Sequence, residues 1–188
     1  MCSGAWHCIP GNDMAQLLTA EIKNFIGVET GVIEFGEPVE RGAVRRFAQA
    51  IMDPDPVYMD EDYTGKTRYR KPVAPPLFLV TMLRARFDAP DLVTENAHDP
   101  DFHGLIDASA MGLPPLPLGN SPQLNAGSEI EMFRLVCHGE TVRMQSRYLD
   151  IHERETSKGH MLFVVIETDF TDVAGKLICR FRKTLLRR

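Results

Sequence analysis

Met161-Leu162-Phe163-Val164-Val165-Ile166 is an uninterrupted apolar run with no polar alternation. A short run of this kind, rich in branched and aromatic residues, is typical of a strand that is covered on both faces. Three other extended segments lie in the same third of the chain, separated by turn-forming residues. We therefore predict an antiparallel meander of four strands, formed by Ser128 to Val136, Thr141 to His152, His160 to Thr171 and Lys176 to Leu186.

Two helical patterns precede this meander. Apolar residues recur every three or four positions between Arg41 and Met52, which predicts a helix there. Asp53-Pro54 ends it, because proline disfavours helical backbone in the residue before it. Pro75-Pro76 opens a second predicted helix, from Leu77 to Leu83, which is apolar on nearly all sides and must therefore be buried.

The N-terminal part predicts one more helix and one more strand. Residues 13 to 26 have an amphipathic pattern with Asp13 as a possible N-cap, and Thr30 to Val39 reads as a strand broken by Gly36 and Pro38. The sum is an α+β domain in which a curved antiparallel sheet wraps around a buried central helix.

The bulk composition indicates a folded domain. The chain has 188 residues, 44% of them hydrophobic, and a net charge of −5, which argues against disorder and against nucleic-acid binding. No apolar stretch approaches the roughly 20 residues that a membrane span needs, so we expect a cytoplasmic location with reduced thiols. Cys2, His7 and Cys8 lack a second ligand pair at the spacing of a zinc site, so no metal is expected.

One segment carries a catalytic pattern. Asp53-Pro54-Asp55-Pro56-Val57-Tyr58 follows the pattern Asp-x-Asn-Pro-Val-His except at its third and last residues. With four other blocks it resembles the N-terminal half of the MaoC-like acyl-CoA dehydratases, also called FAS1-like dehydratase domains, which have the hot-dog fold. Those blocks are Val39 to Ala48, Ala74 to Pro76, Asn125 to Arg134 and Arg182 to Leu185.

The resemblance covers roughly residues 20 to 188. It implies a single hot-dog domain over that range, an N-terminal extension at residues 1–19, and a long inserted loop at about residues 88–123. That loop holds His98 and His103 as well as the proline-rich run from Gly112 to Leu118. The loop could lengthen an acyl pocket or merely cover it.

In the family, the complete half of the enzyme uses an Asp and a His five residues later to add water to an enoyl thioester. Here Asp53 stands at the acidic position and Tyr58 at the position of the His, while Asp55 replaces the Asn. A tyrosine is a poor proton acceptor at neutral pH, because its ordinary pKa is about 10. The resemblance therefore implies the non-catalytic type of half, which pairs with a competent half and shapes the acyl site.

Further site residues follow from the same resemblance. The thioester oxygen needs donors at the start of the buried helix, where Pro75 and Pro76 have no amide hydrogen. Substrate contacts are expected from Asp55, Pro76, Leu77, Phe78, Asn125 and Ser128. Arginine and lysine side chains suit coenzyme A phosphates, and the candidates are Arg134, Arg182 and Lys183. No cofactor is implied beyond a coenzyme A thioester as the substrate.

Three functions remain open at this point. The chain could be a hydratase or dehydratase component that works with a catalytically complete MaoC-like subunit, as a homodimer or a heterodimer. It could be self-sufficient, with Asp53 as the base and a loop histidine such as His103 completing the pair. It could also be a binding module for acyl thioesters without turnover. The acyl group is not determined by the sequence.

Overall fold

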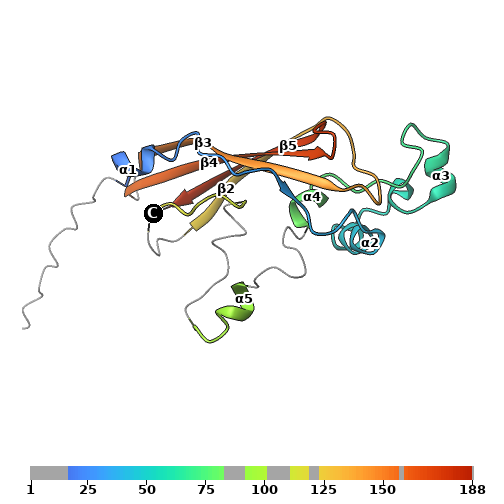
Figure 1. The fold of residues 1–188 in the computed structure, drawn as a ribbon, viewed down its shortest axis with the longest axis horizontal. Helices are drawn as coiled ribbons and strands as arrows, with labels where there is room; N and C mark the ends of the chain where they lie inside the picture. The colour runs from blue at the N-terminus through green and yellow to red at the C-terminus, as the bar shows by residue number, and fades with distance from the viewer. Residues whose placement is uncertain (1–16, 83–91, 101–110, 119–122, 157–158, 188) are drawn as a thin grey trace, which may run out of the picture.

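The computed structural model describes residues 17–82, 92–100, 111–118, 123–156 and 159–187. Its main element is an antiparallel sheet of five strands in the order β1-β3-β4-β5-β2 (Figure 1). The strands are β1 (Ile33–Glu34), β2 (Gln123–Met132), β3 (Val142–Thr156), β4 (Gly159–Asp172) and β5 (Leu177–Arg187). All four predicted strands are present, but only β3, β4 and β5 form a meander, because β2 pairs with β5 and not with β3. The apolar run from Met161 to Ile166 lies in β4, between β3 and β5.

The boundaries of β1, β2 and β3 differ from the prediction, and β3 continues to Thr156, beyond the expected His152. β2 begins at Gln123, upstream of the expected Ser128, and ends at Met132. The expected strand from Thr30 to Val39 is reduced to Ile33 and Glu34, which pair with Met144 and Arg143 of β3. Gly36 and Pro38 follow β1 closely, and both residue types weaken strand pairing. The prediction was therefore right about the strand's existence and wrong about its length.

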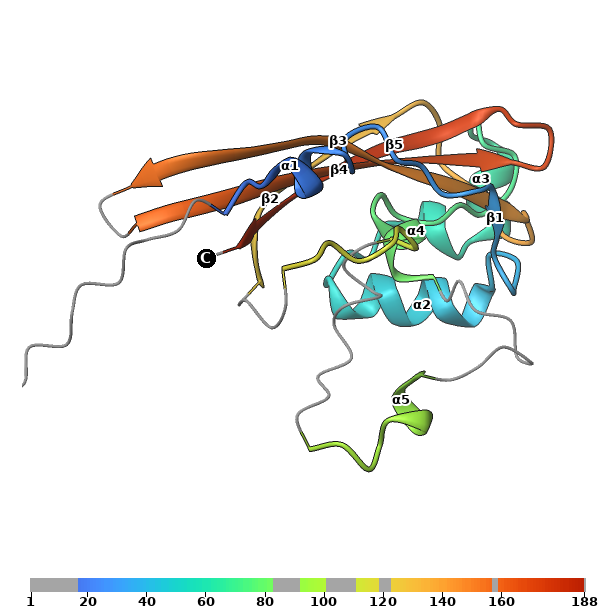
Figure 2. The ribbon, with the colours of Figure 1, turned by 60° about the vertical axis from the view of Figure 1, so that its left-hand side comes forward.

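Short helices accompany the sheet. They are α1 (Ala20–Lys23), α2 (Arg41–Ala50), the 3-10 helix η1 (Pro56–Tyr58), α3 (Glu61–Gly65), α4 (Phe78–Thr81) and α5 (Leu92–Glu95). Figure 2 shows α4 and α2 below one face of the sheet. Val44 and Ala48 of α2 are buried, and Phe47 meets Phe78 of α4 edge to face at 5.7 Å between ring centres. The predicted helix from Arg41 is thus confirmed, with its end at Ala50.

The second predicted helix is much shorter than expected. It begins at Phe78 rather than Leu77 and ends at Thr81, because Met82 is extended. Leu77 has φ 67 and ψ −10, and the Phe78 amide donates to the Pro75 carbonyl oxygen at 3.2 Å. These are the features of a tight turn at Pro75-Pro76, which delays the helix start. Leu77 is 43% exposed, so burial on nearly all sides was also wrong.

The N-terminal helix is a single turn. Thr19, not Asp13, is its N-cap, and the Thr19 hydroxyl accepts a hydrogen bond from the Ile22 amide. Asp13 lies outside the described residues. Among the helices that the structure describes, none combines the length and the hydropathy that crossing a membrane requires.

Part of the predicted loop belongs to the core. Met111 and Leu113 are buried against the sheet, and the Tyr148 hydroxyl of β3 donates to the Pro114 carbonyl oxygen at 2.8 Å. Within the described part of the loop, residues 92–95 form α5. The segment Met111 to Leu118 therefore packs on the sheet instead of simply connecting two elements.

Replacing Gly112 by alanine is expected to destabilise the chain. Gly112 has φ +82, and an added Cβ would lie 3.0 Å from Ile33 Cδ1. Left-handed backbone and this contact together should lower the free energy of unfolding by about 1 to 2 kcal/mol, measured by urea denaturation. Gly31→Ala is the matched control, because its added Cβ meets nothing within 4 Å and its φ is not positive. Equal stability of the two variants would contradict the packing described for this segment.

Candidate functional site

Asp53 follows the end of α2 and lines a surface pocket. The Asp53 amide donates to the Ala48 carbonyl oxygen at 3.0 Å and the Met52 amide to the Gln49 oxygen at 3.2 Å. This pair of bonds is the Schellman motif, in which the residue after the helix is left-handed and usually glycine. Here that residue is Met52, with φ 57. Non-glycine residues in this conformation are strained and are enriched at functional sites.

The structure brings the two residues of the degenerate motif into direct contact. The Tyr58 hydroxyl donates to Asp53 Oδ2 at 2.8 Å, and Asp53 Oδ1 accepts the Asp55 amide at 3.2 Å. The Asp55 carboxylate caps η1, because its Oδ1 accepts the Val57 amide at 2.9 Å. Both oxygens of Asp53 are therefore already hydrogen-bonded within the motif itself.

Tyr58 acts in this site as a donor. Its side chain is buried, and burial, the hydrogen bond to Asp53 and the negative charges of Asp53 and Asp55 all raise the pKa of Tyr58 above its ordinary value. A phenol with a raised pKa stays protonated at neutral pH and cannot accept the proton of a water molecule. The Asp53-Tyr58 pair can thus bind and orient a ligand but lacks the proton acceptor and donor couple that a histidine supplies.

A pocket of about 340 Å³ opens beside this pair, within the size range of small-molecule sites. Its walls come from the last two turns of α2 and from the motif up to Met59. Arg45 and Gln49 line it and are four residues apart, so they share one face of α2. Sequence reasoning missed both residues, although the helical period that predicted α2 also places them on the face that leads to Asp53.

The expected thioester-oxygen donors are only partly available. Pro76 has no amide hydrogen, and the Phe78 amide is used in the turn to Pro75. The Leu77 amide makes no hydrogen bond with any described residue. Asn125 and Ser128 lie on β2 and do not line the pocket of Asp53.

The predicted coenzyme A contacts lie elsewhere and are already paired. Arg134 holds Glu140 through two hydrogen bonds of 3.1 and 2.7 Å and also binds Asp172. Arg182 donates to Glu167 at 2.6 Å. Lys183 lies on β5. A role for Arg134, Arg182 and Lys183 in coenzyme A binding stays a prediction, and neither arginine lines the pocket of Asp53. His103, the loop histidine expected to complete the catalytic pair with Asp53, falls outside the described residues.

Replacing Tyr58 by phenylalanine is expected to lower the free energy of unfolding by about 1 kcal/mol at pH 8, because one charge-assisted hydrogen bond is lost. A raised folded-state pKa stabilises the wild type below the ordinary tyrosine pKa of 10.0, and this contribution declines as the pH rises above it. The gap between wild type and variant should therefore shrink above pH 10.

Urea denaturation at about pH 8 and about pH 11 measures this gap. Tyr63→Phe is the control, since the Tyr63 hydroxyl makes no hydrogen bond with a described residue and its side chain is exposed. A gap that stays constant with pH would contradict the assigned state of Tyr58.

The sheet with its short helices on one face, together with the Asp53-Tyr58 motif at the end of α2, defines an α+β domain of the hot-dog class. The model of the FAS1-like, dehydratase domain region matches residues 24–181. The chain belongs to this family, and its fold is that of the MaoC-like hot-dog dehydratases.

Named relatives agree with this assignment. A UPF0336 protein of Saccharopolyspora erythraea is 27% identical over 88% of this chain and 90% of its own length. A probable enoyl-CoA hydratase alpha subunit of Thermomonospora curvata is also 27% identical, over 80% of this chain but only 45% of its own length. One of these two relatives is thus named as a hydratase subunit, and this chain spans less than half of its length.

Solved structures share the fold. The ChsH1-ChsH2 complex from Mycobacterium tuberculosis matches with a TM-score of 0.64 at 16% identity, over 89% of this chain and 87% of that chain. The HadBC (3R-hydroxyacyl-ACP dehydratase) complex from the same organism matches with a TM-score of 0.57 at 18% identity, over 86% and 96%. At these identities the likeness concerns the fold alone.

Proposed function

We propose that this chain is the half of an acyl-CoA hydratase or dehydratase that lacks the acid-base pair and shapes the acyl site of a complete partner subunit. The hydrogen bond from the Tyr58 hydroxyl to Asp53 is the observation that carries the proposal. A protonated tyrosine occupies the carboxylate that would otherwise receive the proton of the attacking water. The substrate in this proposal is a coenzyme A thioester, and no other cofactor takes part.

Stabilisation of the negative charge on the thioester oxygen is also weak in this chain. Enolate-like charge on the thioester oxygen needs preorganised donors. Two prolines and an amide engaged in a turn leave Leu77 as the one unengaged backbone donor among residues 75–78 of the described chain. A single donor is a poor oxyanion site, so this chain is better suited to holding substrate than to activating it.

A partner subunit is supported by the relatives. Two similar structures are complexes of differently named chains, and one relative is named an alpha subunit. Strand β2 forms one edge of the sheet, because among the described strands it pairs only with β5. An unpaired edge of this length is a template for a strand from another chain.

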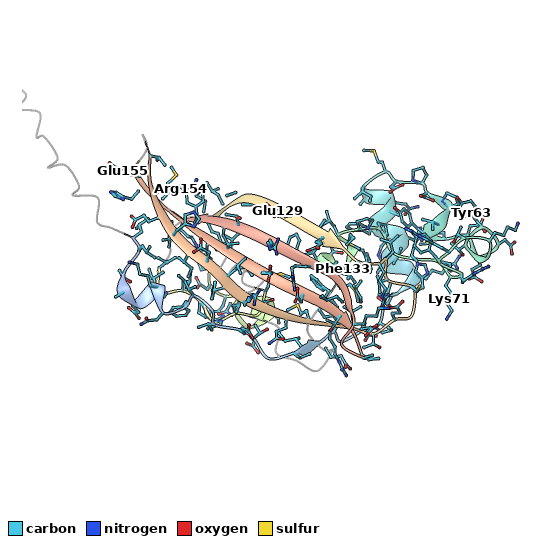
Figure 3. All side chains as sticks on the ribbon, turned by 90° about the horizontal axis from the view of Figure 1, so that it is seen from above. Tyr63, Lys71, Glu129, Phe133, Arg154 and Glu155 are labelled. Carbon is cyan, nitrogen blue, oxygen red and sulfur yellow. The ribbon has the colours of Figure 1, made fainter. Side chains whose placement is uncertain are left out.

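The charges on that edge favour a different chain over a second copy. Arg182 of β5 lies opposite Glu129, and Arg180 of β5 lies opposite Glu131. At both positions the residue on the edge strand β2 is therefore a glutamate. Figure 3 shows Glu129 on this outermost strand. A two-fold axis at Glu129, Ile130 or Glu131 would put glutamate against glutamate, which is destabilising. A partner strand with neutral or basic residues there avoids this repulsion.

Turnover tests the proposal directly. The isolated chain should hydrate a trans-2-enoyl-CoA no faster than buffer, and mixing it with the subunit encoded by the neighbouring gene should raise the rate by at least about 10³-fold. Turnover by the isolated chain would refute the proposal. Loss of that turnover on His103→Ala would then favour the self-sufficient reading, and ligand binding without turnover in any mixture would favour a binding module.

A further inference from the structure

The arginines of the sheet and the cations of the segment that follows α3 differ in their partners. Arg143 binds Glu34, Arg180 binds Asp169, and Arg147 and Arg182 share Glu167. In contrast, the segment Lys66-Thr67-Arg68-Tyr69-Arg70-Lys71 has four cations in six residues and no acidic residue. All four cations are exposed, and none forms an ion pair with a described residue. We refer to residues 66–71 as the basic segment.

The basic segment is held in a defined conformation. The Thr67 hydroxyl donates to the Thr64 carbonyl oxygen at 2.8 Å, and the Tyr69 amide donates to Thr67 Oγ1 at 3.2 Å. Arg70 has φ 64, and its Nη1 donates to the Gly65 carbonyl oxygen at 3.0 Å. A long cationic side chain loses less entropy on binding an anion when its backbone is already fixed.

The Arg68 side chain is held by its neighbour Tyr69, and a backbone hydrogen bond just after the basic segment joins the chain to the catalytic motif. The Arg68 guanidinium lies 4.9 Å from the centre of the Tyr69 ring and donates to the Tyr69 hydroxyl at 2.8 Å. Just after the segment, the Val73 amide donates to the Val57 carbonyl oxygen at 3.1 Å. Figure 3 shows Lys71 and Tyr63 at the same end of the molecule, beyond the sheet.

We propose that the basic segment binds the phosphate groups of the coenzyme A whose acyl end enters the Asp53 pocket. Arg68 and Lys71 are the principal contacts, because their charges face solvent and have no carboxylate partner among the described residues. Guanidinium groups match phosphate oxygens through paired N–H bonds, and an ammonium adds a point charge. The proposal rests on the proposed function and replaces Arg134 and Arg182, whose charges are neutralised, as the phosphate contacts.

Isothermal titration of the full-length chain with free coenzyme A and with dephospho-coenzyme A tests this site. The wild type should bind coenzyme A more tightly than the probe without the 3′-phosphate, and less tightly at high salt. The double variant Arg68→Gln/Lys71→Gln should bind coenzyme A about tenfold more weakly and should discriminate less between the probes. Arg70 is left intact because it supports the local backbone.

The matched control removes two positive charges elsewhere. Lys23 in α1 and Lys176 in the turn after β4 are exposed, so Lys23→Gln/Lys176→Gln has the same net charge as the test variant. Its coenzyme A affinity should equal that of the wild type at the same salt concentration. Unchanged thermal unfolding of the test variant excludes loss of fold as the cause.

Equal coenzyme A affinity of the wild type and the test variant, or no measurable binding by the wild type, overturns the assignment. Binding of an acidic acyl carrier protein that requires Arg68 and Lys71, with coenzyme A unaffected, also overturns it in favour of a protein-bound thioester. Turnover of the mixed subunits is scored separately, so the phosphate site can fail while the proposed function stands.

Discussion

Glu167→Gln is expected to lower the free energy of unfolding by about 2 to 3 kcal/mol. The Glu167 side chain is 3% exposed and accepts hydrogen bonds from Arg147 and Arg182, with Arg180 at 3.8 Å. Removing the carboxylate charge leaves three guanidinium groups without their common counter-ion, which is costly for a buried group. The arginines are themselves partly exposed, so solvent screening limits the expected loss.

The pH dependence gives a second readout for Glu167. Burial alone would raise the pKa of Glu167, but the hydrogen bonds from Arg182 and Arg147 and the nearby positive charges outweigh it and lower the pKa. A depressed folded-state pKa stabilises the protein above the ordinary value of 4.5, and this contribution is lost as the pH falls below it. The variant should therefore lose stability less steeply than the wild type in this acidic range.

Chemical denaturation from neutral to acidic pH measures both effects. Glu129→Gln is the control, because Glu129 is exposed and faces the same arginine row from β2. Its stability should stay within about 0.5 kcal/mol of the wild type, as is usual for surface substitutions. Equal losses for Glu129→Gln and Glu167→Gln would show that burial of the carboxylate does not matter.

Phe170→Ala should have the largest effect on stability, about 4 kcal/mol, because a buried aromatic side chain leaves a cavity that its neighbours only partly fill. Phe170 is 1% exposed on β4, and its ring meets Phe35 edge to face at 6.1 Å. Phe133→Ala serves as the comparison, since Phe133 is 50% exposed and should cost less than about 1 kcal/mol. Similar midpoints of thermal or urea unfolding for the two variants would contradict the core described here.

The strands of the last third were predictable because their periodicity is local. The apolar run of β4 and the alternation of β5 record which faces are covered, and turn residues mark where each strand ends. The start of β2 was missed because Leu124 to Ser128 are exposed on both faces of an edge strand, so no apolar period marks them. The start of α4 was predicted one residue too early because it depends on the left-handed Leu77, a conformation that leucine does not signal.

Some features of the candidate site could likewise be predicted from the sequence, and others could not. Asp53 and Tyr58 are five residues apart, and the motif alone placed them at the Asp and His positions of the family; the hydrogen bond between them is seen in the structure. Whether Arg182 is free to bind phosphate depends on strand register, because Glu167 lies opposite it across β4 and β5. Register between distant strands could not be read from this single sequence. The charges of the basic segment were visible in the sequence, but the Val73–Val57 hydrogen bond that joins the chain after this segment to the motif was not.

Glu129, Glu131 and the Tyr58-Asp53 bond support one account of the molecule, in which a second chain completes both the sheet and the chemistry. This chain would then supply pocket walls, a carboxylate held by a protonated tyrosine, and the basic segment that follows α3. The partner would supply the aspartate and the histidine that exchange protons with the attacking water molecule. The acid-base pair of the assembled enzyme should therefore be insensitive to changes in this chain's motif.

The most direct measurement is kcat of the reconstituted two-subunit enzyme when this chain carries Asp53→Asn. We predict a kcat within about threefold of the wild-type pair, because Asp53 would not take part in proton transfer. The corresponding Asp→Asn change in the partner should lower kcat by about 10² to 10⁴-fold, the range for loss of a general base. A loss of 10²-fold or more from Asp53→Asn in this chain, with the pair still assembled, would contradict the account.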